Sequence, residues 1–200
     1  MLLFSGLGNP GGKFARNRHN AGRMAVEAIA ARYRFGPPRQ RFRGVARDGL
    51  IAGRKIVCLQ PETFMNLSGQ SVGEAMRFFK LNPADVIVFH DELDLAPGKM
   101  RVKTGGGHGG HNGLRSIDAH IGPDYRRVRI GIGHPGAKEL VNPYVLSDFT
   151  REDEEWLIPL LEAIAQETEY LIQGQDAEFQ SRVAMKMNSA VQGESRPGVR

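Results

Sequence analysis

The chain has 200 residues, of which 40% are hydrophobic and 24% charged, a balance typical of one globular domain with its own core. Its one cysteine, Cys58, excludes an internal disulfide, and no run approaches the roughly 18 apolar residues of a membrane-spanning helix. The net charge of +5 is unevenly spread: residues 1–149 carry 22 Lys and Arg against 12 Asp and Glu, whereas residues 150–200 carry 5 against 10. The basic first part would attract a polyanion such as nucleic acid.

The N-terminal residues, Met1 to Gly6, have neither the charged region nor the long apolar run of a signal peptide. Together with the single cysteine, this predicts a cytoplasmic protein that does not contact membranes. The apolar residues Leu2–Phe4 lead directly into glycines, which indicates a short buried strand ending in a tight loop at Gly6–Gly12. A helix is expected from Asn20 to Tyr33.

The next segment is predicted to form a hairpin and then a helix. Residues 39–47 alternate as an exposed basic strand would, Asp48-Gly49 has the composition of a turn, and Lys55–Leu59 returns as a strand. We expect a loop over residues 61–68 and a helix over residues 71–79.

The second half continues the alternation of strands and helices. The run Val86–Phe89 is apolar throughout, as in a strand covered on both faces, and His90-Asp91-Glu92 follows at its C-terminal end. Further elements are expected in this order: a strand at 100–103, a glycine-rich loop at 105–113, a helix from Leu114 and a strand at 128–132.

The C-terminal segment reads as a long amphipathic helix. Thr150 is the expected N-cap, because Asp153 three residues later completes a capping box. Pro159 is expected to kink the helix or to delay its start. The alternation predicts an α/β fold with helices on both faces of a sheet, formed by one domain over residues 1–192, and residues 193–200 are expected to be disordered.

Two glycine motifs match the sequence signatures of known functional sites. Gly6-x-Gly8-x-x-Gly11 matches a dinucleotide-binding fingerprint, but Pro10 and Gly12 keep the loop from leading directly into a helix N-terminus. Gly69-x-Ser71-x-Gly73 matches the nucleophile elbow of serine hydrolases, but it follows a loop rather than a buried strand. We therefore expect neither a nicotinamide cofactor nor a serine nucleophile.

Metal binding is also not expected. His108-x-x-His111 lies among flexible glycines, with no cysteine or carboxylate at ligand spacing. The carboxylates of Asp91, Glu92 and Asp94 are placed to bind a cation, but at a strand end such groups more often cap the backbone or orient a base.

Four loops carry polar groups suited to catalysis, and strand ends of such sheets are where ligands usually bind. A histidine near a carboxylate and several amides is suited to acid–base chemistry at neutral pH. The four groups are Asn9 with Arg18-His19-Asn20, Phe64-Met65-Asn66, Asp91, and His111-Asn112-Gly113.

These blocks resemble, in order and spacing, the signatures of bacterial-type peptidyl-tRNA hydrolases. The resemblance covers about residues 2 to 190 and is carried by five segments. They are Gly6–Gly22, Thr63–Gly69, His90–Asp94, Gly105–Leu114 and Arg129–Pro135. It implies a single α/β domain with a mixed, twisted sheet flanked by helices, and an esterase that frees tRNA from peptides.

The resemblance also implies roles for individual positions. His19 matches the catalytic base, Asp91 the carboxylate that orients it, and Asn9 the residue that senses the blocked amine of the substrate. Phe64 and Met65 would line the cleft. Asn66 and Asn112 match amides that contact the substrate and the tRNA 3′ end, and Lys103 and Arg129 match basic residues that bind phosphate.

Two positions depart from the family pattern. Phe14 replaces a tyrosine, so it can stack on a base but cannot donate a hydroxyl hydrogen bond. Asn17 replaces a threonine. The resemblance implies peptidyl-tRNA as partner, no metal or other cofactor, no obligate protein partner and a monomer.

Two other functions remain open from the sequence. A non-catalytic RNA-binding protein would keep the fold and the basic face without activity, although this chain retains His19, Asp91 and the matching asparagines. A nicotinamide-dependent oxidoreductase would depend on the Gly6–Gly11 loop alone.

Overall fold

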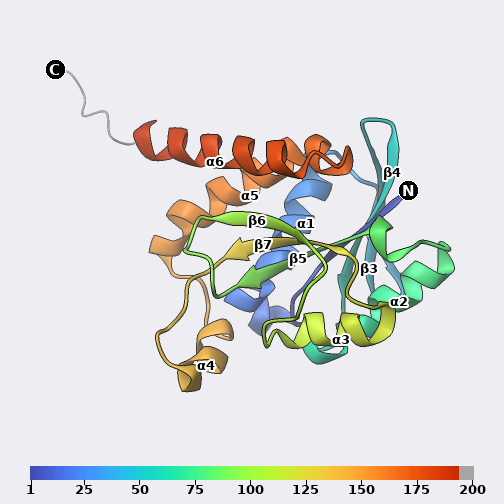
Figure 1. Ribbon diagram of the computed structural model, residues 1–200, viewed down its shortest axis with the longest axis horizontal. Coiled ribbons are helices and arrows are strands. Elements are labelled where there is room, and N and C mark those ends of the chain that lie inside the picture. The colour runs from blue at the N-terminus through green and yellow to red at the C-terminus, as the bar shows by residue number, and fades with distance from the viewer. Residues whose placement is uncertain (194–200) are drawn as a thin grey trace.

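A seven-stranded mixed sheet runs through the computed structural model, which describes residues 1–193 (Figure 1). Its strand order is β2-β3-β4-β1-β5-β7-β6. The four inner strands β4, β1, β5 and β7 are parallel, whereas β2, β3 and β6 pair antiparallel to their neighbours. The strands are β1 (Leu2–Gly6), β2 (Arg39–Arg41), β3 (Gly44–Ile51), β4 (Arg54–Pro61), β5 (Val86–Glu92), β6 (Met100–Thr104) and β7 (Arg126–Gly131). The predicted mixed α/β fold is confirmed.

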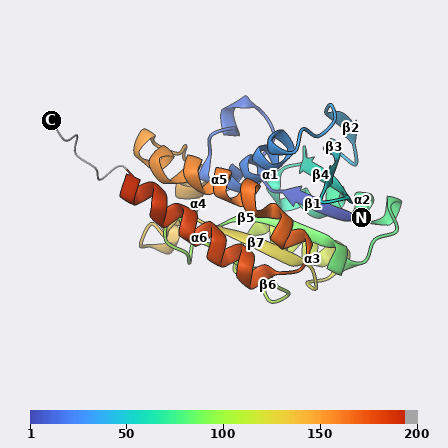
Figure 2. The same cartoon turned by 90° about the horizontal axis from the view of Figure 1, so that it is seen from above.

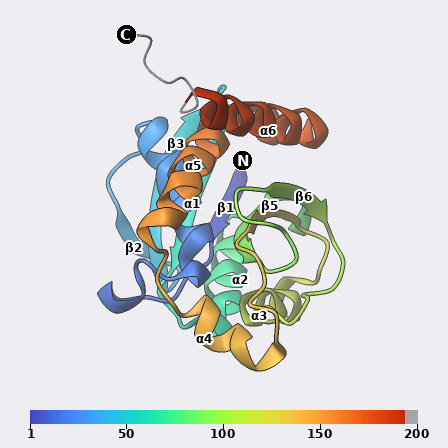
Figure 3. The same ribbon diagram turned by 90° about the vertical axis from the view of Figure 1, so that its left-hand side faces the viewer.

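Helices cover both faces of the sheet (Figure 2). Helices α1 (Ala21–Arg32), α5 (Arg151–Ile172) and α6 (Asp176–Gly193) pack on one face, and α2 (Ser68–Phe78) and α3 (Asn112–Ile121) pack on the other. The short α4 (Val141–Val145) lies beyond the sheet, at the lower end of the molecule in Figures 1 and 3.

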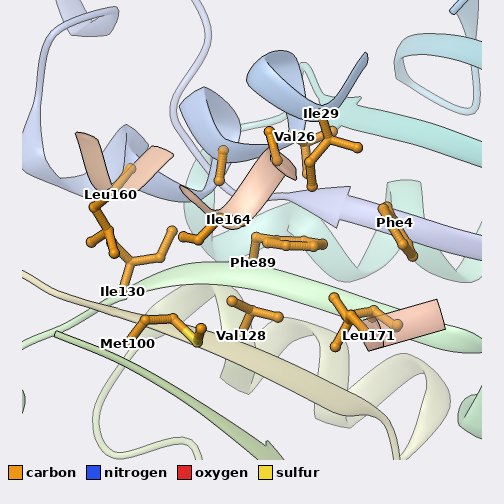
Figure 4. Packing of buried hydrophobic residues seen from close by; sticks show 14 of the residues in the cluster. Phe4, Val26, Ile29, Phe89, Met100, Val128, Ile130, Leu160, Ile164 and Leu171 are labelled. Atoms are coloured by element: carbon orange, nitrogen blue, oxygen red, sulfur yellow. The ribbon is translucent and has the colours of Figure 1, made fainter. Parts of the chain in front are cut away.

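Two apolar clusters, one on each face, hold these layers together. In the larger one the rings of Phe4 and Phe89, with centroids 5.4 Å apart, lie on the sheet and pack with residues of α1 and α5 (Figure 4). Such burial supplies the main stabilising term, roughly 25 cal/mol for each Å² of apolar surface removed from water. The core therefore fixes α1 against the middle of the sheet.

Two glycines let α1 approach the sheet unusually closely. A Cβ atom on Gly22 would lie 1.9 Å from the carbonyl oxygen of Phe89, and one on Gly6 would lie 2.5 Å from the carbonyl oxygen of Gly22. No other residue fits there without moving backbone. This contact brings the start of α1, just after His19, to the C-terminal end of β5.

The predicted turn at Asp48-Gly49 is wrong. Both residues lie inside β3, paired with β4, and the chain reverses at Ala52-Gly53, where φ is 47° and 76°. Positive φ at both positions is the geometry of a tight hairpin turn. Gly49 serves another purpose, because the ring of Phe35 lies where a Cβ atom would be, 2.2 Å away.

The helix boundaries also differ from expectation. Helix α2 begins at Ser68 rather than at 71. The N-cap prediction for Thr150 is confirmed, and α5 starts immediately after it, so Pro159 does not delay the helix. The C-terminal segment forms two helices rather than one, because Gly174, at φ 76°, ends α5 and lets the chain turn into α6.

Helix α6 extends to Gly193, and the remainder of the predicted tail, residues 194–200, lies outside the described residues. Among the helices that the structure describes, none has both the length and the apolar composition needed to cross a membrane.

Candidate functional site

The C-terminal ends of β1 and β5 bring the predicted catalytic residues together. The two strands are parallel neighbours, so both end at the same edge of the sheet. Asn9 lies in the loop after β1, and Asp91 lies near the end of β5. His19 belongs to a 3₁₀ turn, Arg18–Asn20, that leads into α1.

His19 is held directly by Asp91. Its Nδ1 atom lies 2.9 Å from each oxygen of the Asp91 carboxylate, and the two residues are 9% and 3% exposed. A carboxylate accepts hydrogen bonds, so Nδ1 carries the proton and donates it. The lone pair of the neutral ring is therefore on Nε2, which has no hydrogen-bond partner among the described residues.

His111 is a second histidine bonded to the same carboxylate. Its Nε2 lies 2.9 Å from Oδ1 of Asp91, and its Nδ1 accepts hydrogen bonds from the backbone N–H groups of Gly113 and Leu114 at 3.1 and 3.4 Å. His111 is thus the N-cap of α3. Because Nδ1 must accept, Nε2 must donate, which fixes the tautomer of this ring.

The sequence placed His111 among the loop residues suited to catalysis but assigned it no individual role. The helix was predicted from Leu114 but begins at Asn112, directly after His111. Histidine is not among the usual N-cap residues, so the sequence pattern gave little indication of this cap. The link to Asp91 joins residues 20 positions apart and depends on the fold.

The electrostatics of this cluster favour an ionised carboxylate. Burial alone would raise the pKa of Asp91, but the charges and hydrogen bonds of His19 and His111 hold it well below its usual range. Burial, the largest single effect on His19, would lower its pKa, but the charge and hydrogen bond of Asp91 outweigh this and raise the pKa above 6.5.

His90 packs against His111 and the backbone of Asp91. It is fully buried, its Nδ1 donates to the backbone carbonyl of Asp91 at 2.7 Å, and its ring meets that of His111 edge-on with centroids 5.1 Å apart. Burial, followed by the proximity of His111, lowers the pKa of His90 to about 3. His90 is therefore a neutral packing residue at neutral pH.

The side chain of Asn9 is oriented by its neighbours. Its Oδ1 accepts the backbone N–H of Met65 at 2.8 Å. Its own backbone N–H and carbonyl are bonded to the side chain of Asn20, at 2.9 and 3.0 Å. With Oδ1 in use as an acceptor, the NH₂ group of Asn9 is the part left to donate to a ligand.

Asn66 and Asn112 meet in a surface hollow of about 400 Å³. Both side chains are exposed. Arg115 and His120 also line the hollow, and neither was expected from the sequence. They share one face of α3 with Asn112, because they follow it at the spacing of helical turns. This spacing is the sequence pattern from which they could have been identified.

The residues expected to line the cleft differ in exposure. Phe64 is 59% exposed, as a side chain that contacts a ligand can be. Met65 is only 4% exposed and packs in the core beside Leu7, so its contribution to the site is the backbone N–H that holds Asn9. Phe14 is half-buried, with the Lys13 ammonium 4.7 Å from its ring centroid.

The two predicted phosphate-binding residues lie on adjacent strands. Lys103 on β6 pairs with Arg127, two residues before Arg129 on β7, so both predicted residues lie on one face of the sheet. Lys103 is exposed. Arg129 donates from Nε to Glu92 at 2.9 Å, so its charge is partly compensated.

Arg127 supports the glycine-rich loop before His111. It is 2% exposed and donates to the carbonyl oxygens of Gly106 and Gly107, at 2.8 Å each, and to Asp118 at 3.2 Å. An arginine within a buried strand was the sequence signal for this contact. The loop that carries His111 is thereby tied to β7.

The motif Gly69-x-Ser71-x-Gly73, which matches a nucleophile elbow in sequence, has a structural role. Ser71 is fully buried and donates to the carbonyl oxygen of Phe42, so it is not placed as a nucleophile.

His19, Asp91 and His111 have facing atoms within 4.8 Å of one another, close enough to hold a metal ion. In this structure those atoms are paired in hydrogen bonds with each other.

Comparison with known proteins gives a consistent result. The family model described as peptidyl-tRNA hydrolase matches residues 3–191. A peptidyl-tRNA hydrolase of Cereibacter sphaeroides (strain ATCC 17029) is 65% identical over 187 residues, which cover 94% of this chain and 83% of that protein. One from Mesorhizobium japonicum is 57% identical over 195 residues, covering 98% of this chain and 80% of that protein.

A solved structure is similar over nearly the whole fold. The crystal structure of peptidyl-tRNA hydrolase from Acinetobacter baumannii superposes with a TM-score of 0.87 at 42% identity. The match covers 92% of this chain and 94% of that chain.

Proposed function

This chain belongs to the peptidyl-tRNA hydrolase family, and we propose that its buried His19–Asp91 pair carries out the family's reaction. The function is hydrolysis of the ester bond between a peptide and the 3′ end of tRNA, which returns the tRNA for reuse. The observation that carries the proposal is the Nδ1–carboxylate hydrogen bond of 2.9 Å, which leaves Nε2 of His19 as a free base.

The base acts on a water molecule. Nε2 removes a proton as the water oxygen attacks the ester carbonyl, a step that general bases accelerate by roughly 10²–10⁴-fold. The imidazolium that forms is stabilised by the ionised Asp91 beneath it. The proton then passes to the leaving ribose oxygen, which regenerates neutral His19.

Negative charge develops on the carbonyl oxygen during the attack. The exposed amides of Asn66 and Asn112 are the candidates to donate hydrogen bonds to it, a contribution of about 3–4 kcal/mol per donor in other hydrolases. Asn66→Ala and Asn112→Ala, assayed at steady state, separate the two. A variant that changes only KM excludes its residue from stabilising the oxyanion.

Binding of the tRNA is proposed to depend on the basic face. Lys103 and Arg129 would contact phosphates, and Arg115 brings a cation to the hollow between Asn66 and Asn112. Phosphate contacts carry no sequence information, so they suit an enzyme that accepts many tRNAs. Phe64, being exposed, is placed to stack on a base.

The active unit is proposed to be a cytoplasmic monomer. The support for a monomer is that the hydrogen-bonded cluster of His19, Asp91 and His111 is completed within one chain. Size-exclusion chromatography with light scattering at assay concentration tests the monomer, and fractionation of cells tests the compartment.

The protonation state of His19 predicts a pH profile. The pKa of His19 is raised above 6.5, mainly because Asp91 outweighs the effect of burial. Since only the neutral ring accepts a proton, kcat/KM should fall as the pH decreases through a value above 6.5. An acidic limb centred below that value would contradict the assignment of His19 as the base.

The decisive experiment compares wild type with His19→Ala on N-acetyl-aminoacyl-tRNA, with EDTA present. We expect rapid cleavage by wild type and a loss of roughly 10²–10⁴-fold in the variant. Cleavage that is equally fast in the variant would exclude His19. No cleavage by wild type, with tRNA still bound, would point to an RNA-binding protein without activity.

A further inference from the structure

Arg18 is a buried cation that the proposed reaction does not use. It is 8% exposed and directly precedes His19 in the 3₁₀ turn. Arginine is rarely buried to this extent unless its charge and its donors are satisfied. Its partners therefore show what the turn is attached to.

All the partners of the guanidinium belong to one segment of the chain. Nη2 donates to Oδ2 of Asp153 at 2.6 Å, and Nη1 donates to Oγ of Ser147 at 2.9 Å and to the carbonyl oxygen of Asp148. We call residues 141–150, which comprise α4 and the segment that leads to α5, the strap. Arg18 thus connects the strap and the start of α5 to the turn that carries His19.

The backbone makes the same connection. The N–H of Arg18 donates to the carbonyl oxygen of Ser147 at 3.0 Å, and the N–H of Phe149 donates to the carbonyl oxygen of Arg16 at 2.9 Å. The strap and the residues before His19 therefore run side by side as a short antiparallel bridge.

Aromatic rings complete the environment of the guanidinium. It lies over the rings of Tyr144 and Phe149, with centroids 4.7 and 5.5 Å away. The hydroxyl of Tyr144 donates to the carbonyl oxygen of Ile132 at 2.5 Å, just beyond the end of β7. The strap is thus also anchored to the residue that follows β7.

Asp153 is itself rigidly held. Its Oδ2 accepts the backbone N–H of Thr150 at 2.8 Å in the capping box of α5, and its Oδ1 accepts the indole N–H of Trp156 at 3.3 Å. Its side chain is 19% exposed. Arg18 therefore bonds to a carboxylate whose position is already fixed by the first turn of a 22-residue helix.

On the other side of His19, Asn20 is bonded to both backbone groups of Asn9. His19 is thus flanked by two anchored side chains, one tied to the loop after β1 and one tied to the strap. We propose that Arg18 is a positioning residue that, by docking on Asp153 and the strap, holds the His19 imidazole in line with Asp91.

The chain offers a matched control two residues before Arg18. Arg16 and Glu154 form another ion pair between the same two segments, with Nη2 to Oε1 at 2.6 Å, but their side chains are 61% and 37% exposed. An exposed pair contributes roughly 0–1 kcal/mol, and it does not flank His19. Removing this pair should leave kcat unchanged.

The inference depends on the proposed role of His19 as the base, so the test includes His19→Ala. Arg18→Gln, Asp153→Asn and their double variant are compared with Arg16→Gln and Glu154→Gln. The substrate is N-acetyl-aminoacyl-tRNA, kcat and KM are measured from pH 5 to 8.5, and thermal unfolding gives the folded fraction.

We expect Arg18→Gln and Asp153→Asn each to lower kcat about tenfold with little change in KM, because a small misplacement of a base is costly. The double variant should be no worse than Arg18→Gln, since both remove one interaction. Arg18→Lys, which keeps the charge but reaches fewer acceptors, should lose less.

The pH profile separates positioning from a simple charge effect. The charged or titratable groups around His19 are Asp91 on β5, His111 before α3, and the Arg18–Asp153 pair. Loss of the Arg18 cation alone would move the acidic limb of kcat/KM to higher pH. A loosened hydrogen bond from His19 to Asp91 should instead move the acidic limb to lower pH. The same shift is expected in the double variant, in which the net charge is unchanged because one cation and one anion are removed.

Three outcomes would overturn the inference. The first is an acidic limb of kcat/KM that does not move in Arg18→Gln or Asp153→Asn, with losses of kcat that follow the folded fraction. The second is an equal loss of kcat in Arg16→Gln, and the third is full kcat in the double variant. If Arg18→Gln does not fold, Arg18→Lys and Asp153→Asn decide by the same readouts. Full activity in His19→Ala would instead refute the proposed function, whatever Arg18 does.

Discussion

At the end of β5, His19 and Asp91 are buried, and both His19 and the partly buried His111 are bonded to the Asp91 carboxylate, whereas Phe64, Asn66, Lys103 and Asn112 are exposed. The inner cluster is organised before substrate arrives, which saves the cost of arranging it during the reaction. The outer surface is open and adaptable. Substitutions in the cluster should therefore lower kcat, and substitution of a surface residue that contacts only tRNA phosphate, such as Lys103, should raise KM.

The largest effect is expected for Asp91→Asn, which attacks the inner cluster at its centre. An amide in this position favours the wrong tautomer of His19 and removes the charge that stabilises its imidazolium. We expect kcat to fall by about 10³–10⁴-fold with a small change in KM, as in comparable base–carboxylate pairs. Single-turnover rates measure this, and a loss confined to KM would refute the assignment.

Asn9→Asp tests the boundary between the two regions. A carboxylate can still accept the N–H of Met65, but it offers no donor to the peptide carbonyl and attracts a free ammonium. We expect kcat/KM on N-acetyl-aminoacyl-tRNA to fall by about 10²-fold, for loss of a hydrogen bond and added repulsion. The ratio of kcat/KM on N-acetyl-aminoacyl-tRNA to kcat/KM on aminoacyl-tRNA with a free amine should also fall. An unchanged ratio would show that Asn9 does not select for the blocked amine.

The comparison of His111→Asn with His111→Ala separates the two functions of this residue. Asparagine can still cap α3 but cannot reach Asp91, so stability should be kept while kcat falls about tenfold, the equivalent of roughly 1.4 kcal/mol for one charged hydrogen bond. Alanine should lose the cap as well, at about 1 kcal/mol of stability. Thermal unfolding and kcat together distinguish these results.

The smallest effects are expected on the outer surface. Lys103→Ala should raise KM for tRNA substrates several-fold, leave kcat unchanged and lower the salt dependence by about one unit of log–log slope. Glu92→Gln, which releases the Arg129 guanidinium, should lower KM about twofold. A minimal ester substrate serves as the control, and equal losses on both substrates would contradict a phosphate contact.

Local pattern was sufficient where neighbours in sequence decide the structure. The buried strand at Val86–Phe89, the cap at Thr150 and the α/β alternation were predicted correctly from pattern, and the mixed sheet from the family resemblance. The turn at Asp48-Gly49 was wrong because the glycine makes room for Phe35, a residue distant in sequence. Likewise, Gly174 ends a helix that apolar periodicity alone would have continued.

The same division holds for the candidate site. The sequence by itself determined the chemical groups: a histidine, a carboxylate, several amides, a basic surface and the family that combines them. Only the tertiary structure decided that one carboxylate serves both His19 and His111, that Met65 is buried, and that Arg18 is docked on Asp153. Such contacts join residues 20 to 135 positions apart, so no local periodicity encodes them, and they form only when core packing brings strand ends and helix starts to the same edge of the sheet.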